Sequence, residues 1–112
     1  MDLYNELLGM IEELNVSIKQ LRTNGTKLAE AEKDYKITLR TEALKLKADG
    51  LPVTLINQVI NGVQDVADKR FARDVAEAIY NANQEHINAT KLKMRILESQ
   101  LDREWGAAKR TV

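Results

Sequence analysis

Hydrophobic residues recur every three or four positions along the first half of the chain, which is the spacing of a coiled-coil helix. Counted in sevens, two apolar columns form: Tyr4, Ile11 and Ile18 at a, and Leu7, Leu14 and Leu21 at d. The dipeptide Asn24-Gly25 is typical of a turn, and Thr26 could cap a new helix after it. The register nevertheless continues through Leu28, Tyr35, Leu39 and Leu46. We therefore favour one continuous helix over residues 2–49, with a break at Asn24-Gly25 as the alternative.

The tetrapeptide Asp49-Gly50-Leu51-Pro52 predicts the end of this helix. Proline lacks a backbone N–H, and the residue before it avoids the α conformation. Gly50 fits the left-handed position that closes a helix. We expect a short helix over residues 54–61, capped by Thr54 and ended by Gly62. Its apolar residues share one face, which favours a cover over the end of a hairpin; a docking surface for a partner is the alternative.

A second long helix is predicted over residues 63–105, because apolar residues form a broad stripe through this segment. Gly106 is expected to end it, and residues 107–112 to fray. The fold class is therefore all-α. We predict a single domain, residues 1–112, that forms an elongated, coiled-coil-like antiparallel helical hairpin with the short helix at its tip.

The antiparallel arrangement predicts which residues meet. If the first helix ends opposite the start of the second, Gly25 faces residues 82–89, and Trp105 packs over Leu7 or Leu8 at the open end. Two helices bury only one stripe each, and the stripe of the second helix is wide. We therefore expect two hairpins to associate as a homodimer with a four-helix bundle.

Composition narrows the function classes. Seventeen basic residues balance seventeen acidic ones, so any binding to nucleic acid must come from a local patch. The absence of cysteine excludes disulfides and thiolate chemistry. The acidic N-terminus does not resemble a signal peptide, and no apolar run approaches the length of a membrane span. We expect a soluble, cytoplasmic protein that binds no membrane.

Basic residues spaced three, four and seven apart form a stripe before the tip: Lys33, Lys36, Arg40 and Lys47. Three further cations could extend it across the second helix: Lys69, Arg70 and Arg73. Such a stripe could follow a phosphate backbone, so these seven residues are candidate nucleic-acid contacts. The alternative is an ordinary solvated face, because acidic residues are interleaved and only Tyr35 and Phe71 could stack on bases.

The polar stretch of residues 80–88 is unusual for a helix that packs in a core. Five of its residues are candidates for a partner surface: Asn81, Asn83, Gln84, Glu85 and Asn88. The alternative is structural, because a buried amide can fix the register of two helices. His86 lacks the Glu-x-x-His spacing of a helical metal site, since residue 83 is Asn. We assign no catalytic, metal or cofactor-binding residue and expect a protein that is not an enzyme.

Three segments carry a resemblance to a known group of proteins: Pro52–Ile56, Asp68–Glu77 and Arg95–Gly106. Together they resemble small, poorly characterised helical proteins encoded in early regions of phages and prophages of Gram-positive bacteria, over the length from Leu3 to Gly106. Such genes commonly lie beside single-strand-binding and recombination genes. The resemblance implies a role in phage DNA metabolism or in managing host enzymes, inside the host cytoplasm.

The leading hypothesis is a non-enzymatic phage accessory protein that binds replication or recombination partners, with DNA as a further candidate ligand. One alternative is an inhibitor that docks on a host defence or nuclease enzyme through the acidic N-terminal segment or the polar stretch. A second alternative is a purely structural oligomeric coiled-coil protein.

Overall fold

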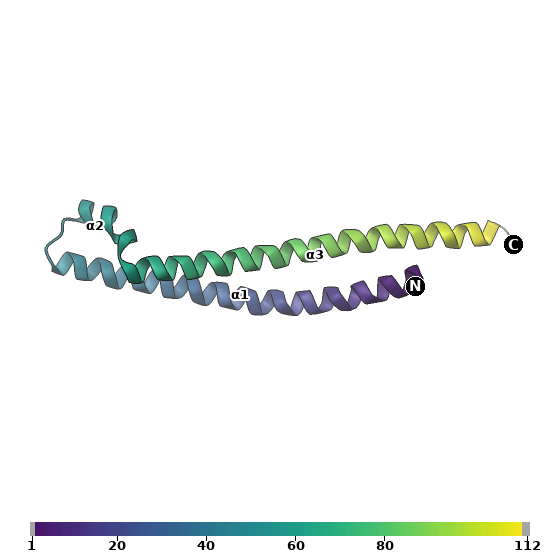
Figure 1. The fold of residues 1–112 in the computed structure, drawn as a ribbon, viewed down its shortest axis with the longest axis horizontal. Coiled ribbons are helices and arrows are strands. Elements are labelled where there is room, and N and C mark those ends of the chain that lie inside the picture. Colours follow the sequence, from purple (N-terminus) through teal and green to yellow (C-terminus); the bar gives the residue numbers. More distant parts are fainter. Residues whose placement is uncertain (1, 111–112) are drawn as a thin grey trace. The chain divides into compact units, whose positions relative to one another are not determined.

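A computed structural model describes residues 2–110, with the side chains of residues 2–108. The described chain contains helices and no strand: α1 (Leu3–Ala48), α2 (Val53–Val59), the 3-10 helix η1 (Ile60–Gly62) and α3 (Gln64–Arg110) (Figure 1). The predicted all-α helical hairpin, with a short helix between two long ones, is confirmed. The chain divides into two compact units. Of the described residues, 2–22 and 81–110 form the first unit, and Thr23–Tyr80 form the second.

In the first unit, the contact between α1 and α3 uses one of the two predicted apolar columns of α1. Leu7, Leu14 and Leu21 are half-buried, as the register predicts. Tyr4, Ile11 and Ile18 are exposed, so their prediction as contact residues is wrong. Leu3, Met10 and the buried Ser17 occupy the contact instead. A serine allows the helices to approach closely, and α3 supplies a hydrogen bond there, which offsets the smaller apolar area.

Helix α1 continues through Gly25, so the favoured prediction of one helix is confirmed. Within the second unit, a Cβ built on Gly25 would lie 3.3 Å from Cε1 of Tyr80. The glycine therefore lets the Tyr80 ring approach the backbone of α1. The prediction that Gly25 faces residues 82–89 is wrong, because its neighbour on α3 is Tyr80, two residues before that range.

The end of α1 follows the sequence prediction at Gly50, whose φ is +94°. The N–H of Gly50 donates to the carbonyl of Lys47 at 3.0 Å, and the N–H of Leu51 donates to the carbonyl of Leu46 at 3.1 Å. These two bonds form the Schellman motif that satisfies the last carbonyl groups of a helix. Leu46 and Leu51 both pack against the core of the second unit, which completes the motif.

Helix α2 begins at Val53, earlier than predicted. The carbonyl of Pro52 accepts bonds from the N–H groups of Leu55 and Ile56, each at 3.0 Å, so Pro52 is the N-cap. The prediction of Thr54 as the cap is wrong, because Thr54 lies inside the helix. Within the second unit, the predicted covering role is confirmed for Ile56 and Ile60, whereas Leu55 and Val59, predicted on the same face, are exposed. Ile56, Ile60 and Val66 are buried together, with half-buried neighbours that come largely from α1: Tyr35, Leu39, Ala43, Leu46, Leu51 and Val63.

Helix α3 does not end at Gly106 but continues to Arg110. A single glycine costs a helix about 1 kcal/mol and does not end it when alanine and basic residues follow. The predicted fraying of residues 107–112 thus falls partly on helical residues, and residues 111–112 lie outside the described chain. The last turns of α3 run past the start of α1 (Figure 1). Trp105 is 68% exposed, so its predicted packing over Leu7 or Leu8 is wrong.

The apolar stripe of α3 divides into two faces, where the sequence predicted one broad inward face. Tyr80, Asn83, Ile87, Thr90, Met94 and Leu97 are buried or half-buried. By contrast, a second set of large apolar residues is exposed: Phe71, Val75, Ile79, Leu92 and Ile96. The inward face is thus more polar than predicted, and a second apolar face remains on α3.

Candidate binding surfaces

The first candidate surface lies in the second unit, at the end where α2 covers α1. A groove of about 330 Å³ has mainly apolar walls from both helices and two cations at its edge. We call it the tip groove; it is lined by Lys36, Leu39, Arg40, Ala43, Ile56, Asn57 and Ile60. Leu39 and Ala43 are fixed by packing against Ile56 and Ile60. Because Lys36 and Arg40 are one helical turn apart on α1, both side chains lie on the same side of the groove.

The four basic residues predicted on α1 are all exposed: Lys33, Lys36, Arg40 and Lys47. Lys69, which was predicted to extend this stripe, lines a different groove of about 480 Å³ in the same unit. That groove also contains the acidic residues Glu42, Asp65 and Asp68, and it shares no lining residue with the tip groove. Lys69 therefore lines a groove other than the one at whose edge Lys36 and Arg40 lie.

Arg73, another predicted nucleic-acid contact, is half-buried and contacts two side chains of the second unit. Its guanidinium carbon lies 4.7 Å from the centre of the Tyr35 ring, which is a cation–π contact. Its Nε and Nη2 atoms both donate to Oδ1 of Asp74, at 3.2 and 2.8 Å. The hydrogen bond to Asp74 raises the pKa of Arg73 above its usual value. Arg73 therefore stabilises the fold locally, whereas Arg70 is exposed on α3.

The polar stretch of α3 divides between a structural and a surface role, and its residues 81–88 belong to the first unit. Asn83 is buried, and its Nδ2 donates to the carbonyl oxygen of Ser17 at 3.1 Å. This is the buried amide that the structural alternative predicted. The other four candidate residues are exposed: Asn81, Gln84, Glu85 and Asn88. Three of them, Gln84, Glu85 and Asn88, line a shallow hollow of about 320 Å³ with Leu21, Ile87 and Lys91.

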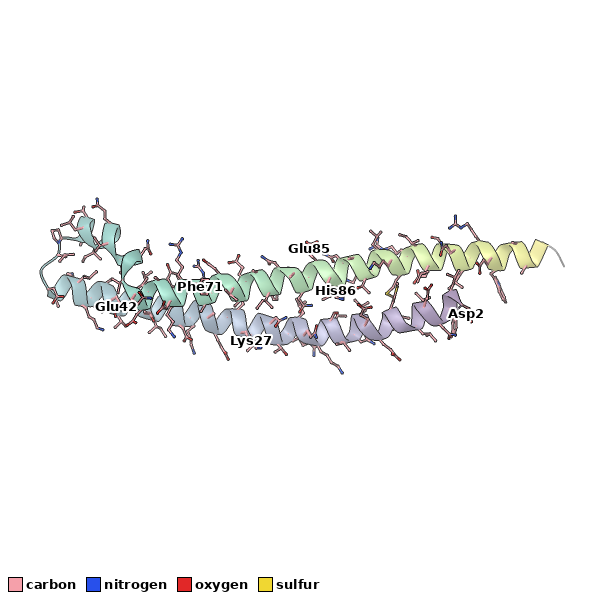
Figure 2. The ribbon with its side chains drawn as sticks, viewed as in Figure 1. Asp2, Lys27, Glu42, Phe71, Glu85 and His86 are labelled. Atoms are coloured by element: carbon pink, nitrogen blue, oxygen red, sulfur yellow. The ribbon has the colours of Figure 1, made fainter. Side chains whose placement is uncertain are left out.

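His86 contacts α1 on the side of α3 that faces it (Figure 2). Its Nε2 atom lies 3.1 Å from Oε1 of Glu13, and its carbonyl accepts a hydrogen bond from Oγ1 of Thr90 at 2.9 Å. Within the described residues, no group of three or more histidine and acidic side chains could hold a metal ion. Among the helices of residues 2–110, none has an apolar segment long enough to cross a bilayer.

Two surfaces of the structure were not predicted from the sequence. The tip groove depends on the placement of α2 against α1, which no local pattern predicts. The exposed face of α3 did have a signal, because Phe71, Val75, Leu92 and Ile96 repeat at heptad spacing, apart from the residues that are buried. Comparisons with protein-family models, curated proteins and solved structures found no match to this chain.

Proposed function

We propose that this chain is a non-enzymatic binding protein whose tip groove holds an acidic, amphipathic segment of a partner protein. The observation that carries this proposal is the composition of the groove. Its walls are apolar, and its two charged lining residues, Lys36 and Arg40, are both cations. Such a groove suits a helix or peptide that presents apolar side chains on one face and carboxylates beside them.

The surroundings of the groove enlarge this surface. Lys33 and Lys47 lie on the same side of α1 as Lys36 and Arg40, which extends the positive charge in both directions. Val53, Leu55 and Val59 of α2 are also exposed, between 44% and 62%. Apolar side chains left in water beside an apolar groove are typical of an interaction site. A bound segment would bury them and place its acidic residues near the cations.

A protein partner fits this unit better than a nucleic acid does. Proteins that bind single strands combine cations with aromatic side chains on which bases stack. Here Tyr35 is half-buried with the guanidinium of Arg73 over its ring, and no aromatic side chain lines the tip groove. The four cations of α1 could still attract phosphates, so binding of DNA is an outcome to be measured.

The resemblance to phage-encoded helical proteins suggests the setting. We propose that the partner belongs to a replication or recombination machinery and that binding occurs in the host cytoplasm. The competing hypothesis, an inhibitor of a host enzyme, would use the acidic N-terminal segment or the polar stretch. The polar stretch offers a smaller surface than predicted, because Asn83 is buried against Ser17. The tip groove is therefore the better-supported contact.

The proposal is tested with a fluorescently labelled amphipathic peptide, about four helical turns long, that has Leu and Phe on one face and Asp and Glu on the other. We expect binding at low salt that weakens as salt is added. Asn57→Asp places a negative charge in the groove and should weaken binding about tenfold. Asn61→Asp is the matched control, because Asn61 is exposed in η1 and does not line the groove.

A labelled oligothymidylate, measured in parallel, separates the alternatives. No binding of the peptide at low salt, or an equal effect of both asparagine substitutions, would overturn the proposal. Binding of oligothymidylate alone, reduced by Arg40→Glu but not by Lys27→Glu, would replace it with the nucleic-acid hypothesis. Lys27 is the control for this comparison because it is an exposed lysine of α1 outside the tip groove.

A further inference from the structure

One side of α3 is apolar and exposed. We call it the outer face; its residues are Phe71, Val75, Ala78, Ala82, Glu85, Ala89, Leu92 and Ile96, and all of them are exposed. They are spaced alternately four and three apart, which is the heptad pattern of a coiled-coil contact. Seven of these eight side chains are apolar. Phe71 is 70% exposed, and Leu92 and Ile96 are each more than half exposed.

Most of the outer face is turned away from the residues that contact α1, although Val75 also lines a hollow with Asn24 and Lys27 of α1. Each residue of an α-helix is rotated by about 100° from the one before it. Leu92 is two residues from Thr90 and from Met94, which are buried or half-buried, so it is rotated by about 200° from both. Figure 2 shows Glu85 on the side of α3 that faces away from α1. Single exposed apolar residues need no explanation, but a row of them on one helix marks an interaction surface.

We propose that a second copy of this chain covers the outer face, with the two α3 helices antiparallel. Placing Val75 opposite Leu92 of the second copy fixes the whole register, because a twofold axis then relates every pair. Phe71 meets Ile96, and Ala78 meets Ala89. Large side chains therefore pack at both ends of the contact, and the alanines in the middle allow the helices to approach closely.

The charged residues beside the outer face select this orientation. The residues just before Val75, Ala82, Ala89 and Ile96 flank the apolar contact and pair with one another along its edge. In the antiparallel register, Asp74 pairs there with Arg95 of the second copy, and Asn81 pairs with Asn88. The twofold axis repeats both pairs. Arg73 donates both of its bonds to Oδ1 of Asp74, so Oδ2 can accept from the second copy. The first pair joins opposite charges, and the second joins two amide side chains that can hydrogen-bond to each other.

A parallel pair of α3 helices would be worse in two respects. It would place Glu85 directly opposite Glu85 of the second copy, where two carboxylates repel each other. It would also place Asp74 opposite the apolar Ile79. In the antiparallel register each Glu85 lies opposite Ala82, and the two carboxylates are displaced along the axis by about 4.5 Å. The antiparallel pair therefore has less charge repulsion.

This inference does not rest on the tip groove, whose residues belong to α1, α2 and η1. It refines the predicted four-helix dimer. In that dimer the α3 helices of the two copies would lie against each other. Peptide binding at the tip and assembly through α3 can therefore fail independently.

Cysteine cross-linking tests the register, because the chain contains no cysteine. Ala78→Cys and Ala89→Cys copies, carrying different tags, are mixed and oxidised. Residues 78 and 89 meet in the antiparallel pair, so the mixed disulfide should form in preference to either homodimeric one. Preferential cross-linking of Ala78→Cys to itself would show a parallel pair and overturn the proposal. No cross-link, together with a monomeric mass of the wild type at all concentrations, would overturn it as well.

Charge exchange provides a second test that does not depend on disulfide formation. Asp74→Lys alone places Lys opposite Arg95, and Arg95→Glu alone places Glu opposite Asp74, so each variant should dimerise at least about tenfold more weakly than wild type. When the two variants are mixed, both pairs become attractive, and the heterodimer should form. Helical content by circular dichroism should remain unchanged in Arg95→Glu. If both variants dimerise as wild type does, or if mixing restores nothing, the proposed register is wrong.

Discussion

Asn83 of α3 donates a hydrogen bond of 3.1 Å to the backbone carbonyl of Ser17 in α1, and both residues are buried. A side chain that bonds the backbone of the opposite helix fixes how the two helices are aligned along their length. Leucine or isoleucine at these positions would add apolar area but would permit neighbouring alignments. In the first unit, polarity inside the contact therefore contributes to specificity.

Asn83→Ala should lower the free energy of unfolding by about 1 kcal/mol, because it removes this hydrogen bond from a buried site. Asn81→Ala is the matched control: Asn81 is exposed on the same helix, and its replacement should change stability by less than about 0.5 kcal/mol. Urea unfolding followed by circular dichroism measures both variants. Equal effects of the two substitutions would show that the Ser17 contact contributes nothing.

Gly50→Ala should destabilise the protein by about 1–2 kcal/mol, because the φ of +94° is strained for a residue with a Cβ atom. Gly62→Ala is the control. A Cβ at Gly62 would meet no atom within 4 Å, and its backbone has no positive φ. Thermal unfolding of the two variants compares them directly. A Gly50→Ala variant as stable as Gly62→Ala would contradict the assignment of Gly50 as the left-handed end of α1.

Alanine at two glycines of α1 should separate helix propensity from packing. Gly9→Ala should stabilise the protein by about 0.5–1 kcal/mol, because a Cβ there would meet no atom within 4 Å. Gly25→Ala gains the same propensity, but its Cβ would lie 3.3 Å from the Tyr80 ring, which must shift. We expect a smaller gain, measured as a smaller rise in melting temperature. An equal rise would mean that the Tyr80 ring moves aside at no cost.

The buried end of the second unit should depend on Ile56, which is only 6% exposed. Ile56→Ala should cost about 2–3 kcal/mol, because it leaves a cavity against Ile60 and Val66. Leu55→Ala is the matched control, since Leu55 is 45% exposed on the same helix. Hydrogen exchange provides the local readout, and protection of the α2 amides should fall only in Ile56→Ala. Loss of protection in both variants would show that α2 is not held by this cluster.

The element pattern could be predicted because each helix end has a local signal. Pro52 and Gly50 act through their own backbone conformations, and the heptad pattern continues through Gly25 whether or not a partner helix is present. Local signals were weaker at the end of α3, where Gly106 alone did not outweigh the helix-forming residues after it.

The contacts between the helices could not be predicted to the same degree. The heptad pattern of α1 predicted Ile18 at the contact, but the structure buries Ser17 while Ile18 stays exposed. That choice depends on Asn83, which lies far away in the sequence. In the same way, Lys36 and Arg40 read as part of a long basic stripe, and only the position of α2 makes them the edge of an apolar groove.

Trp105 is the only tryptophan in the chain, and its side chain is largely in water. Its emission should therefore already be that of a solvated indole in the native protein and should change little when the core melts. An unfolding experiment that relies on tryptophan fluorescence would report a flat baseline and could be mistaken for extreme stability. The same property makes Trp105 a clean optical label for the C-terminal end of α3, sensitive to any molecule that comes to cover it.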